Sequence, residues 1–230
     1  MGTVYLIPSL LHDEGMEAMP AYLLPAARNC QVFFVENERT TRRYLKLLSK
    51  EIVIDDYAWY NMADKTAPAI FRQQLKDNKT IGLISEAGCP GVADPGQAFV
   101  AIAQEMGASV RPLVGPSSIL LALMASGMNG QQFHFAGYLP IDNVERAKAI
   151  RELEAESARK NCTQIFIETP YRNNQMIEAI LKNCRPATKL CIAADLTSKQ
   201  EWIRTKTVAE WQKEKIDMHK RPLIFLLLAS

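Results

Sequence analysis

The sequence has 230 residues, of which 48% are hydrophobic and 23% are charged, and its net charge is +2 at pH 7. This length suits either one large α/β domain or two domains of roughly a hundred residues each, with enough apolar side chains for a sizeable core. The small net charge excludes nucleic-acid binding through a high overall positive charge, so any basic surface must be local.

The five cysteines form no Cys-x-x-Cys pair, and the three histidines are far apart in the sequence. We therefore expect neither a disulfide framework nor a metal site, and we expect Cys162, Cys184 and Cys191 to be buried free thiols. The first residues carry no basic n-region, and Pro8 interrupts their short apolar run, which argues against a signal peptide. No apolar run reaches the roughly twenty residues that span a bilayer, so we expect a cytoplasmic protein.

Apolar strands and amphipathic helices alternate through the first half of the chain, a pattern that predicts a parallel sheet. The predicted strands are Val4–Ile7, Gln31–Val35, Ile52–Ile54, Ile81–Ser85 and Ser109–Val114. The predicted helices cover Glu38–Ser49 after an Asn37 cap, Ala67–Leu75, the segment from Asp94-Pro95 to Gly107, and ILLALMAS before Gly127.

The turn-rich segment Ser126–Gln132 is the clearest linker, and the pattern restarts after it. The predicted elements there are strands at Phe133–Leu139, Thr163–Glu168, Leu190–Ala194, Glu201–Lys206 and Pro222–Ala229, and helices at Asn143–Lys160 and from Thr169-Pro170 to about Cys184. We therefore expect an α/β fold with an N-terminal domain over residues 1–116 and a C-terminal domain with a mixed sheet over residues 117–230.

Two consecutive predicted strands end in glycine- and proline-rich loops that open into helices. The first, here called the central loop, reads SEAGCPGVADPG (Ser85–Gly96), and the second reads Gly115-Pro116-Ser117-Ser118. In open α/β sheets, ligands bind at the carboxyl ends of strands, and small residues let a ligand approach the backbone closely. The two loops are thus a predicted binding site for a small polar ligand. On a purely structural interpretation, Asp94 and Ser117 are helix caps and Gly115-Pro116 is a tight turn.

Several common enzyme motifs are absent. The sequence contains no G-x-x-x-x-G-K-[ST], no G-x-G-x-x-G and no G-x-S-x-G. Their absence argues against a P-loop kinase or GTPase, the usual dinucleotide fingerprint and an α/β-hydrolase.

The central loop closely resembles the S-D-A-G-T-P-x-x-x-D-P-G motif of the tetrapyrrole (corrin/porphyrin) methylase superfamily. The resemblance continues through LVGPSSILLALMASGMNGQQFHFAGYLP and recurs in ENERTTRR and IFIETPYRN, which makes four blocks in the right order. The most similar branch is the ribosomal RNA small-subunit methyltransferase I type, which methylates a cytidine 2′-hydroxyl. The resemblance implies two α/β domains with S-adenosylmethionine in a cleft between them, the substrate on the N-terminal side and the cofactor on the C-terminal side, and a homodimer.

Carried over position by position, the resemblance also implies site residues. The implied cofactor contacts are Ser85, Glu86, Gly88, Cys89, Pro90, Val92, Ser117, Ser118, Glu168, Thr169, Ala194, Asp195 and Leu223. For an RNA substrate, the phosphates would lie on Arg39, Arg42, Arg43 and Arg172. Glu36 is the candidate general base for a ribose hydroxyl, with a structural alternative as the partner of Arg39 or Arg42. The basic helix face could equally be only solvated.

The chain also departs from the pattern of that branch. PSLLHDEGMEAM, from Pro8, stands where the branch has T-P-I-G-N-L-x-D-I-T, Cys89 replaces a threonine, and Tyr171 replaces a histidine. Two other functions therefore remain open: methylation of a tetrapyrrole or another small molecule, and non-catalytic binding of S-adenosylmethionine. Activity on a corrinoid precursor would favour the first, and the absence of any turnover would favour the second.

Overall fold

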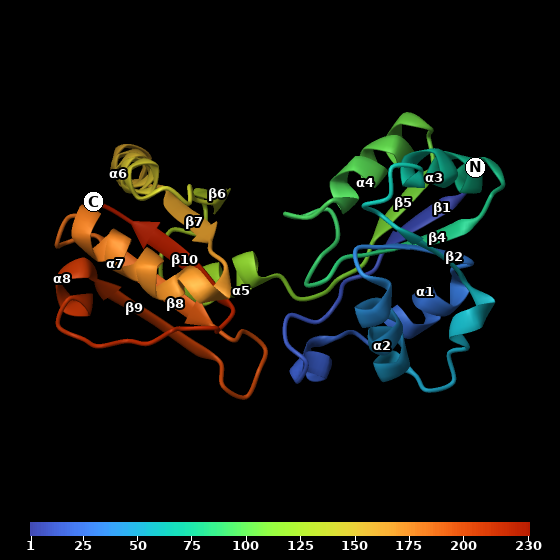
Figure 1. Ribbon diagram of the computed structural model, residues 1–230, viewed down its shortest axis with the longest axis horizontal. Coiled ribbons are helices and arrows are strands. Elements are labelled where there is room, and N and C mark those ends of the chain that lie inside the picture. The colour runs from blue at the N-terminus through green and yellow to red at the C-terminus, as the bar shows by residue number, and fades with distance from the viewer. The chain divides into compact units, whose positions relative to one another are not determined.

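Each half of the chain folds around its own five-stranded sheet (Figure 1). The computed structural model describes all 230 residues, Met1–Ser230, and divides into one unit over Met1–Ser117 and a second over Ser118–Ser230. The two units are described separately below.

The first unit contains a parallel sheet with the strand order β3-β2-β4-β1-β5. Its strands are β1 (Thr3–Leu6), β2 (Val32–Val35), β3 (Ala58–Asn61), β4 (Thr80–Ile84) and β5 (Ser109–Pro112). Its helices are α1 (Leu23–Asn29), α2 (Glu38–Leu48), α3 (Ala67–Lys76) and α4 (Gly96–Glu105), with short 3₁₀ turns η1 (Gly15–Ala18) and η2 (Ile54–Asp56). Since all five strands run the same way, their carboxyl ends lie along one edge of the sheet.

The two aromatic residues of β2 divide the core of this unit between the two faces of the sheet. Phe34 packs edge-on against Phe71 of α3, with ring centroids 5.0 Å apart, and Phe33 stacks on Trp59 of β3, also at 5.0 Å. Both phenylalanines are fully buried. A parallel sheet covered on both faces requires such uninterrupted apolar strands, which explains why VFFV does not alternate with polar residues.

The second unit contains a mixed sheet with the order β6-β7-β10-β8-β9, in which β6 and β7 are parallel and the other pairs are antiparallel. The strands are β6 (Phe133–Tyr138), β7 (Thr163–Ile167), β8 (Lys189–Ala194), β9 (Trp202–Thr207) and β10 (Leu223–Leu228). The helices are α5 (Ser118–Ser126), α6 (Asn143–Lys160), α7 (Asn173–Asn183) and α8 (Val208–Trp211), and the 3₁₀ turn η3 (Pro170–Arg172) precedes α7.

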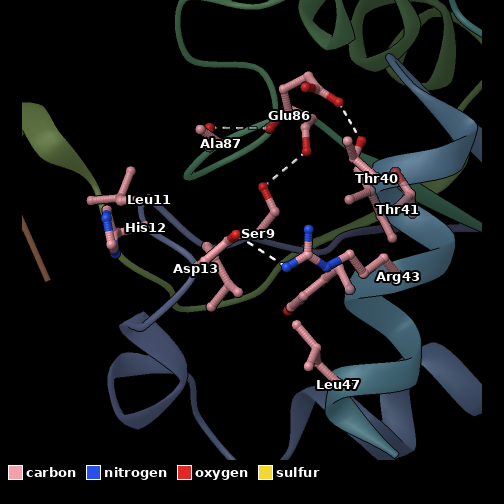
Figure 2. Close-up of a pocket in the computed structure, with 14 residues that line it drawn as sticks. Ser9, Leu11, His12, Asp13, Thr40, Thr41, Arg43, Leu47, Glu86 and Ala87 are labelled. Atoms are coloured by element: carbon pink, nitrogen blue, oxygen red, sulfur yellow. Dashed lines mark hydrogen bonds and ion pairs between the residues drawn. The ribbon is translucent and has the colours of Figure 1, made fainter. Parts of the chain in front are cut away.

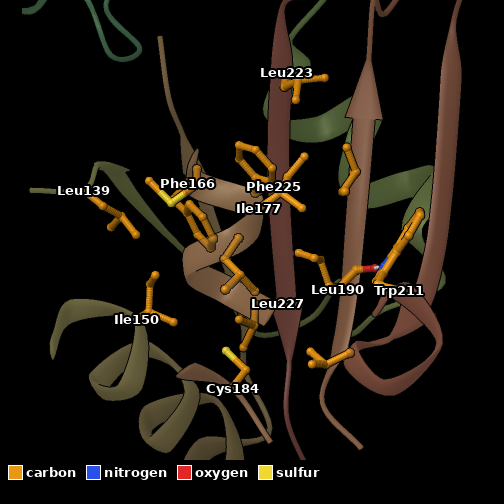
Figure 3. Packing of buried hydrophobic residues seen from close by; sticks show 14 of the residues in the cluster. Leu139, Ile150, Phe166, Ile177, Cys184, Leu190, Trp211, Leu223, Phe225 and Leu227 are labelled. Atoms are coloured by element: carbon orange, nitrogen blue, oxygen red, sulfur yellow. Dashed lines mark hydrogen bonds between the residues drawn. The ribbon is translucent and has the colours of Figure 1, made fainter. Parts of the chain in front are cut away.

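The core of the second unit lies between this sheet and helices α6, α7 and α8 (Figure 3). Phe166 of β7 and Phe225 of β10 stack with their ring centroids 5.5 Å apart. Trp211 of α8 is fully buried, and its indole N–H donates to the carbonyl of Leu190 at 2.9 Å. This hydrogen bond satisfies the one polar group of a large buried side chain.

One predicted strand is wrong, and two short helices were not predicted. Ile52–Ile54 is not a strand: Ile52 is buried in the core without strand pairing, and the edge strand is Ala58–Asn61, which pairs with β2. The helix α1 was not predicted; Pro25 is accommodated as its third residue, where no intrahelical N–H bond is lost. The short helix α8 was not predicted; it is fixed by a capping box between Thr207 and Glu210.

All five cysteines are free thiols, and the predicted burial of Cys162, Cys184 and Cys191 is confirmed. No group of three or more histidine, cysteine, aspartate or glutamate side chains is placed to hold a metal ion. No helix has both the length and the apolar character needed to cross a membrane.

Candidate functional site

In the first unit, the loops that follow the adjacent strands β1 and β4 are bonded to each other. The backbone N–H of Ser9 donates to the carbonyl of Gly88 at 2.9 Å, and the N–H of Gly88 donates back at 3.3 Å. The buried Ser9 hydroxyl donates to the carbonyl of Ser85 at 2.9 Å. These three bonds fix the beginning of the central loop to the end of β1.

The loop after β5 contacts both the loop after β1 and the central loop. A Cβ atom on Gly115 would lie 2.2 Å from Cβ of Pro8, so only glycine allows this approach. The Cys89 thiol donates to the carbonyl of Pro116, with the sulfur 3.5 Å from the oxygen. Burial, and then the negative charge of Asp94, raise the pKa of Cys89, so the thiol keeps the proton that this bond uses. The loops after β1, β4 and β5 therefore form one connected surface.

The backbone of the central loop turns through two left-handed glycines, Gly88 with φ of 72° and Gly91 with φ of 86°. The Asp94 carboxylate accepts from the N–H of Gly91 at 2.9 Å and from the N–H of Gly96 at 2.7 Å. Asp94 thus closes the loop and caps the first residue of α4, with Pro95 one position before the helix. These bonds give the loop a fixed shape, with Pro90 buried and Val92 exposed.

The start of α2 is also attached to the central loop. One carboxylate oxygen of Glu36, Oε2, accepts from the backbone N–H of Glu86 at 2.6 Å. The Thr40 hydroxyl donates to the Glu86 carboxylate. Glu36 is therefore engaged in holding the loop, whereas its second oxygen accepts no hydrogen bond.

A pocket of about 230 Å³ lies among these elements (Figure 2). It is lined by the segment Ser9–Asp13, by α2 and by residues Ile84–Ala87. Asp13 and Arg43 form an ion pair of 3.1 Å that joins this segment to α2. The segment that departs most from the family's pattern therefore lines the pocket beside the central loop.

Three of the four predicted phosphate-binding arginines have carboxylate partners. Arg42 pairs with Glu38 and lies 5.3 Å from the ring centre of Trp59, Arg43 pairs with Asp13, and Arg172 of the second unit pairs with Glu168. Arg39 is exposed and has no side-chain partner. An anion binding to α2 would thus meet Arg39 directly but would compete with carboxylates for the other two.

In the second unit, five of the predicted cofactor contacts lie together at one end of the sheet, and Ser118 begins α5. Glu168 and Thr169 follow β7, Ala194 ends β8 next to Asp195, and Leu223 begins the antiparallel strand β10 opposite Ala194. The N–H of Asp195 donates to the carbonyl of Pro222 at 3.0 Å. Ala194 and Leu223 have buried side chains, so their backbones are the parts available to a ligand.

Among these residues, Glu168 has a buried carboxylate oxygen without a hydrogen-bond partner, which most clearly indicates a ligand-binding position. It is 4% exposed, and its Oε1 accepts from Arg172 Nη2 at 2.7 Å and from the N–H of Thr169 at 2.6 Å. Its other oxygen, Oε2, is buried and has no partner. Buried carboxylate oxygens are normally bonded, so a donor supplied by a ligand fits this position. The chemistry suits S-adenosylmethionine, which carries amine and hydroxyl donors.

The structure also uses residues that the sequence pattern did not single out. Ser9 and Thr40 hold the central loop, and Arg221 pairs with Asp195 at 2.6 Å. Ser9 lies in the segment with no match to the branch motif, so no family pattern marked it. Its position in the loop that follows the first strand was the one available signal.

Comparison with known proteins identifies the family. Residues 15–212 match the family model described as Tetrapyrrole (Corrin/Porphyrin) Methylases. The chain belongs to this family. The match confirms the family and the fold class that the motifs predicted, and it supports a methyltransferase with S-adenosylmethionine as cofactor.

Two curated relatives are named Ribosomal RNA small subunit methyltransferase I. The protein from Micromonospora olivasterospora is 32% identical over 87% of this chain, and that from Bacillus subtilis is 30% identical over 93%. The chain spans 61% of the length of the first and 71% of the second. Among solved structures, a uroporphyrin-III C-methyltransferase from Thermus thermophilus, complexed with S-adenosylhomocysteine, has a TM-score of 0.59 and 14% identity over 99% of this chain and 97% of its own. That likeness concerns the fold.

Proposed function

We propose that this tetrapyrrole methylase family member is an S-adenosylmethionine-dependent methyltransferase that modifies a ribose 2′-hydroxyl of small-subunit ribosomal RNA. The observation that carries the proposal is the match to two curated ribosomal RNA small-subunit methyltransferases along 87% and 93% of the chain. The pre-shaped loops of the first unit and the unpartnered carboxylate oxygen of Glu168 in the second support it.

Proposed cofactor contacts occur in each unit. In the first they are Ser85, Glu86, Gly88, Cys89, Pro90, Val92 and Ser117; in the second they are Ser118, Glu168, Thr169, Ala194, Asp195 and Leu223. When bound, S-adenosylmethionine supplies a methyl carbon bonded to a positively charged sulfur. The protein's own contribution is to hold an acceptor hydroxyl close to this carbon and to exclude water.

A ribose hydroxyl is a weak nucleophile, so a base near it would help. Glu36 keeps one unoccupied carboxylate oxygen while the other bonds the N–H of Glu86, which fits either a base or a positioning residue. Glu36→Gln separates these roles, because the amide oxygen still accepts that N–H but is not basic. A base role predicts a fall in kcat of a hundredfold or more for Glu36→Gln. A positioning role predicts near-normal kcat for Glu36→Gln and a loss only for Glu36→Ala.

The exposed Arg39 is the proposed first phosphate contact, followed by Arg42, Arg43 and Arg172 after exchange of their carboxylate partners. RNA affinity should then fall with rising salt, and Arg39→Gln should reduce the slope of log affinity against log salt by about one. An unchanged slope would remove Arg39 from the RNA-binding surface.

The whole proposal is tested in two steps. Calorimetric titration with S-adenosylmethionine measures binding, and tritium transfer from the labelled cofactor to small ribosomal subunits that lack the modification measures activity. The control is Gly88→Val, which forces a branched side chain into a backbone with φ of 72° and should abolish both. Cofactor binding without transfer to any ribosomal particle would refute the RNA substrate, and transfer to a corrinoid precursor would replace it.

We also propose that the protein acts as a homodimer in the cytoplasm, where ribosomal subunits are assembled. The family resemblance supports the dimer. Light scattering should then give twice the chain mass of 25.8 kDa. A monomer at micromolar concentration would contradict the dimer but not the enzymatic proposal.

A further inference from the structure

The tyrosine that follows Glu168 by three positions is an exposed aromatic side chain close to a buried, ligand-ready carboxylate. Tyr171 lies in η3 and is 69% exposed. It is thus a large apolar ring that contributes little to the core. Exposed aromatic rings beside basic groups are the usual means by which proteins bind unpaired nucleotides.

The ring is not isolated, because two residues of the segment before β10 lie beside it. The His219 ring lies edge-on to it, with centroids 5.9 Å apart and planes at 75°. The Lys220 ammonium lies 5.6 Å from the centre of the Tyr171 ring. Tyr171, His219 and Lys220, here called the aromatic–basic cluster, come from two segments that are about 50 residues apart in the sequence.

Hydrogen bonds hold these two segments together. The N–H of Lys220 donates to the carbonyl of Pro170 at 3.0 Å. The side-chain amide of Asn173, which is fully buried, donates to the carbonyl of Met218 at 3.0 Å and to that of Arg221 at 2.7 Å. The cluster is therefore ordered before any ligand arrives, which lowers the entropic cost of binding.

Lys220 adopts a left-handed backbone, with φ of 63°. This conformation is uncommon for a residue other than glycine or asparagine, and it persists where the surrounding structure enforces it. Here the bond to Pro170 and the two bonds from Asn173 enforce it. The strained backbone places the ammonium group beside the Tyr171 ring.

The charges around the cluster indicate what it can bind. Arg172 is neutralised by Glu168, and Arg221 by Asp195. A hydrogen bond from Asn174 lowers the pKa of Asp217, so this neighbour is anionic at neutral pH. Lys220 is the remaining cation without a carboxylate partner. One cation cannot hold an RNA strand by charge alone, so ring stacking must supply most of the affinity.

We propose that the aromatic–basic cluster is a binding site for one unpaired nucleotide of an RNA substrate, with the base stacked on Tyr171 and the adjoining phosphate at Lys220. The inference rests on the proposed RNA substrate and adds a contact outside the set of residues carried over from the family. The site holds a base without reading its identity, because every base presents a similar face to an aromatic ring. It would position the RNA strand close to Glu168.

The test uses the full chain and a fluorescently labelled single-stranded 12-nucleotide RNA, with affinity measured by anisotropy at several salt concentrations. Tyr171→Ala should weaken binding by roughly 5- to 150-fold without changing the salt slope. Tyr171→Phe keeps the ring and should bind within about twofold of the unmodified chain. The matched control is Tyr138→Ala, which removes an exposed tyrosine of β6 and should leave affinity unchanged.

Lys220→Asn removes the charge with a residue that tolerates the left-handed backbone, so the fold is preserved. It should reduce the salt slope by about one. Calorimetric titration with S-adenosylmethionine on each variant verifies that the second unit remains folded.

Equal RNA affinity for Tyr171→Ala and the unmodified chain would overturn the inference, as would the absence of RNA binding by the unmodified chain. If uroporphyrin binding depends on Tyr171 and RNA binding does not, the cluster binds a macrocycle and the RNA assignment is wrong. Failure of methyl transfer to ribosomal subunits, combined with a loss of RNA binding in Tyr171→Ala, would refute the proposed function and leave the nucleotide site intact.

Discussion

Gly115→Ala tests whether the three strand-end loops of the first unit form one connected surface. The added Cβ would lie 2.2 Å from Cβ and 2.3 Å from Cγ of Pro8. Ordinary van der Waals contact begins near 3.4 Å, so the proline ring or the loop after β5 must retreat by about 1.2 Å. Pro8 cannot yield alone, because its carbonyl accepts from the Tyr44 hydroxyl at 2.8 Å and the next residue, Ser9, is bonded to the central loop.

The expected cost of this overpacking is about 1–3 kcal/mol in the free energy of unfolding of the first unit. Because the displacement reaches the central loop, affinity for S-adenosylmethionine should fall at least tenfold. Urea denaturation and calorimetric titration measure the two effects. The matched control is Gly130→Ala, since nothing lies within 4 Å of the added Cβ there. If Gly115→Ala has the stability and cofactor affinity of Gly130→Ala, the loops are not coupled through Pro8.

Three further predictions concern single side chains. Glu168→Gln should weaken cofactor binding and destabilise the second unit by about 1–3 kcal/mol, since the Arg172 guanidinium loses its carboxylate; equal calorimetric affinity would contradict this. Asp94→Ala removes three acceptor contacts and should speed hydrogen exchange at the amides of Gly91 and Gly96, whereas unchanged protection would show that the loop keeps its shape without the cap. Burial raises the pKa of Cys30 to about 12, so above pH 9 the unfolded chain loses a proton that the folded chain keeps. Stability should then fall by about 1 kcal/mol between pH 9 and 10 from this group, and Cys30→Ala should flatten that part of the urea-derived stability profile.

The sequence predicts most of the fold because each sheet is built from uninterrupted apolar strands. VFFV of β2 and LIFLLL of β10 have no other plausible location than a core, and Asn37 fulfils its predicted role as the cap of α2 by accepting from the N–H of Arg39 at 3.0 Å. The edge strand Ala58–Asn61 was missed because half-exposed residues carry no strong pattern, and its pairing with β2 is what makes it a strand.

The candidate site was predictable in its location but not in its contacts. Glycines and prolines after β4 and β5 mark loops by their own chemistry, and the carboxylate of Asp94 acts over a few residues. The bonds from Ser9 to Ser85 and from Thr40 to Glu86 join residues 76 and 46 positions apart. Such partners depend on which strands are neighbours in the sheet, and no local pattern encodes that order.

The strand order of the second unit has a consequence for biosynthesis. β10 lies in the middle of its sheet, between β7 and β8, yet it follows the other four strands along the chain. During translation, β7 and β8 therefore lack the strand that pairs with both of them, and the sheet cannot be completed until residue 228 has left the ribosomal exit tunnel. The first unit is complete at residue 117 and can fold while the second is still being made. Chaperone binding to the nascent chain should accordingly concentrate on the interval between the synthesis of β7 and that of β10.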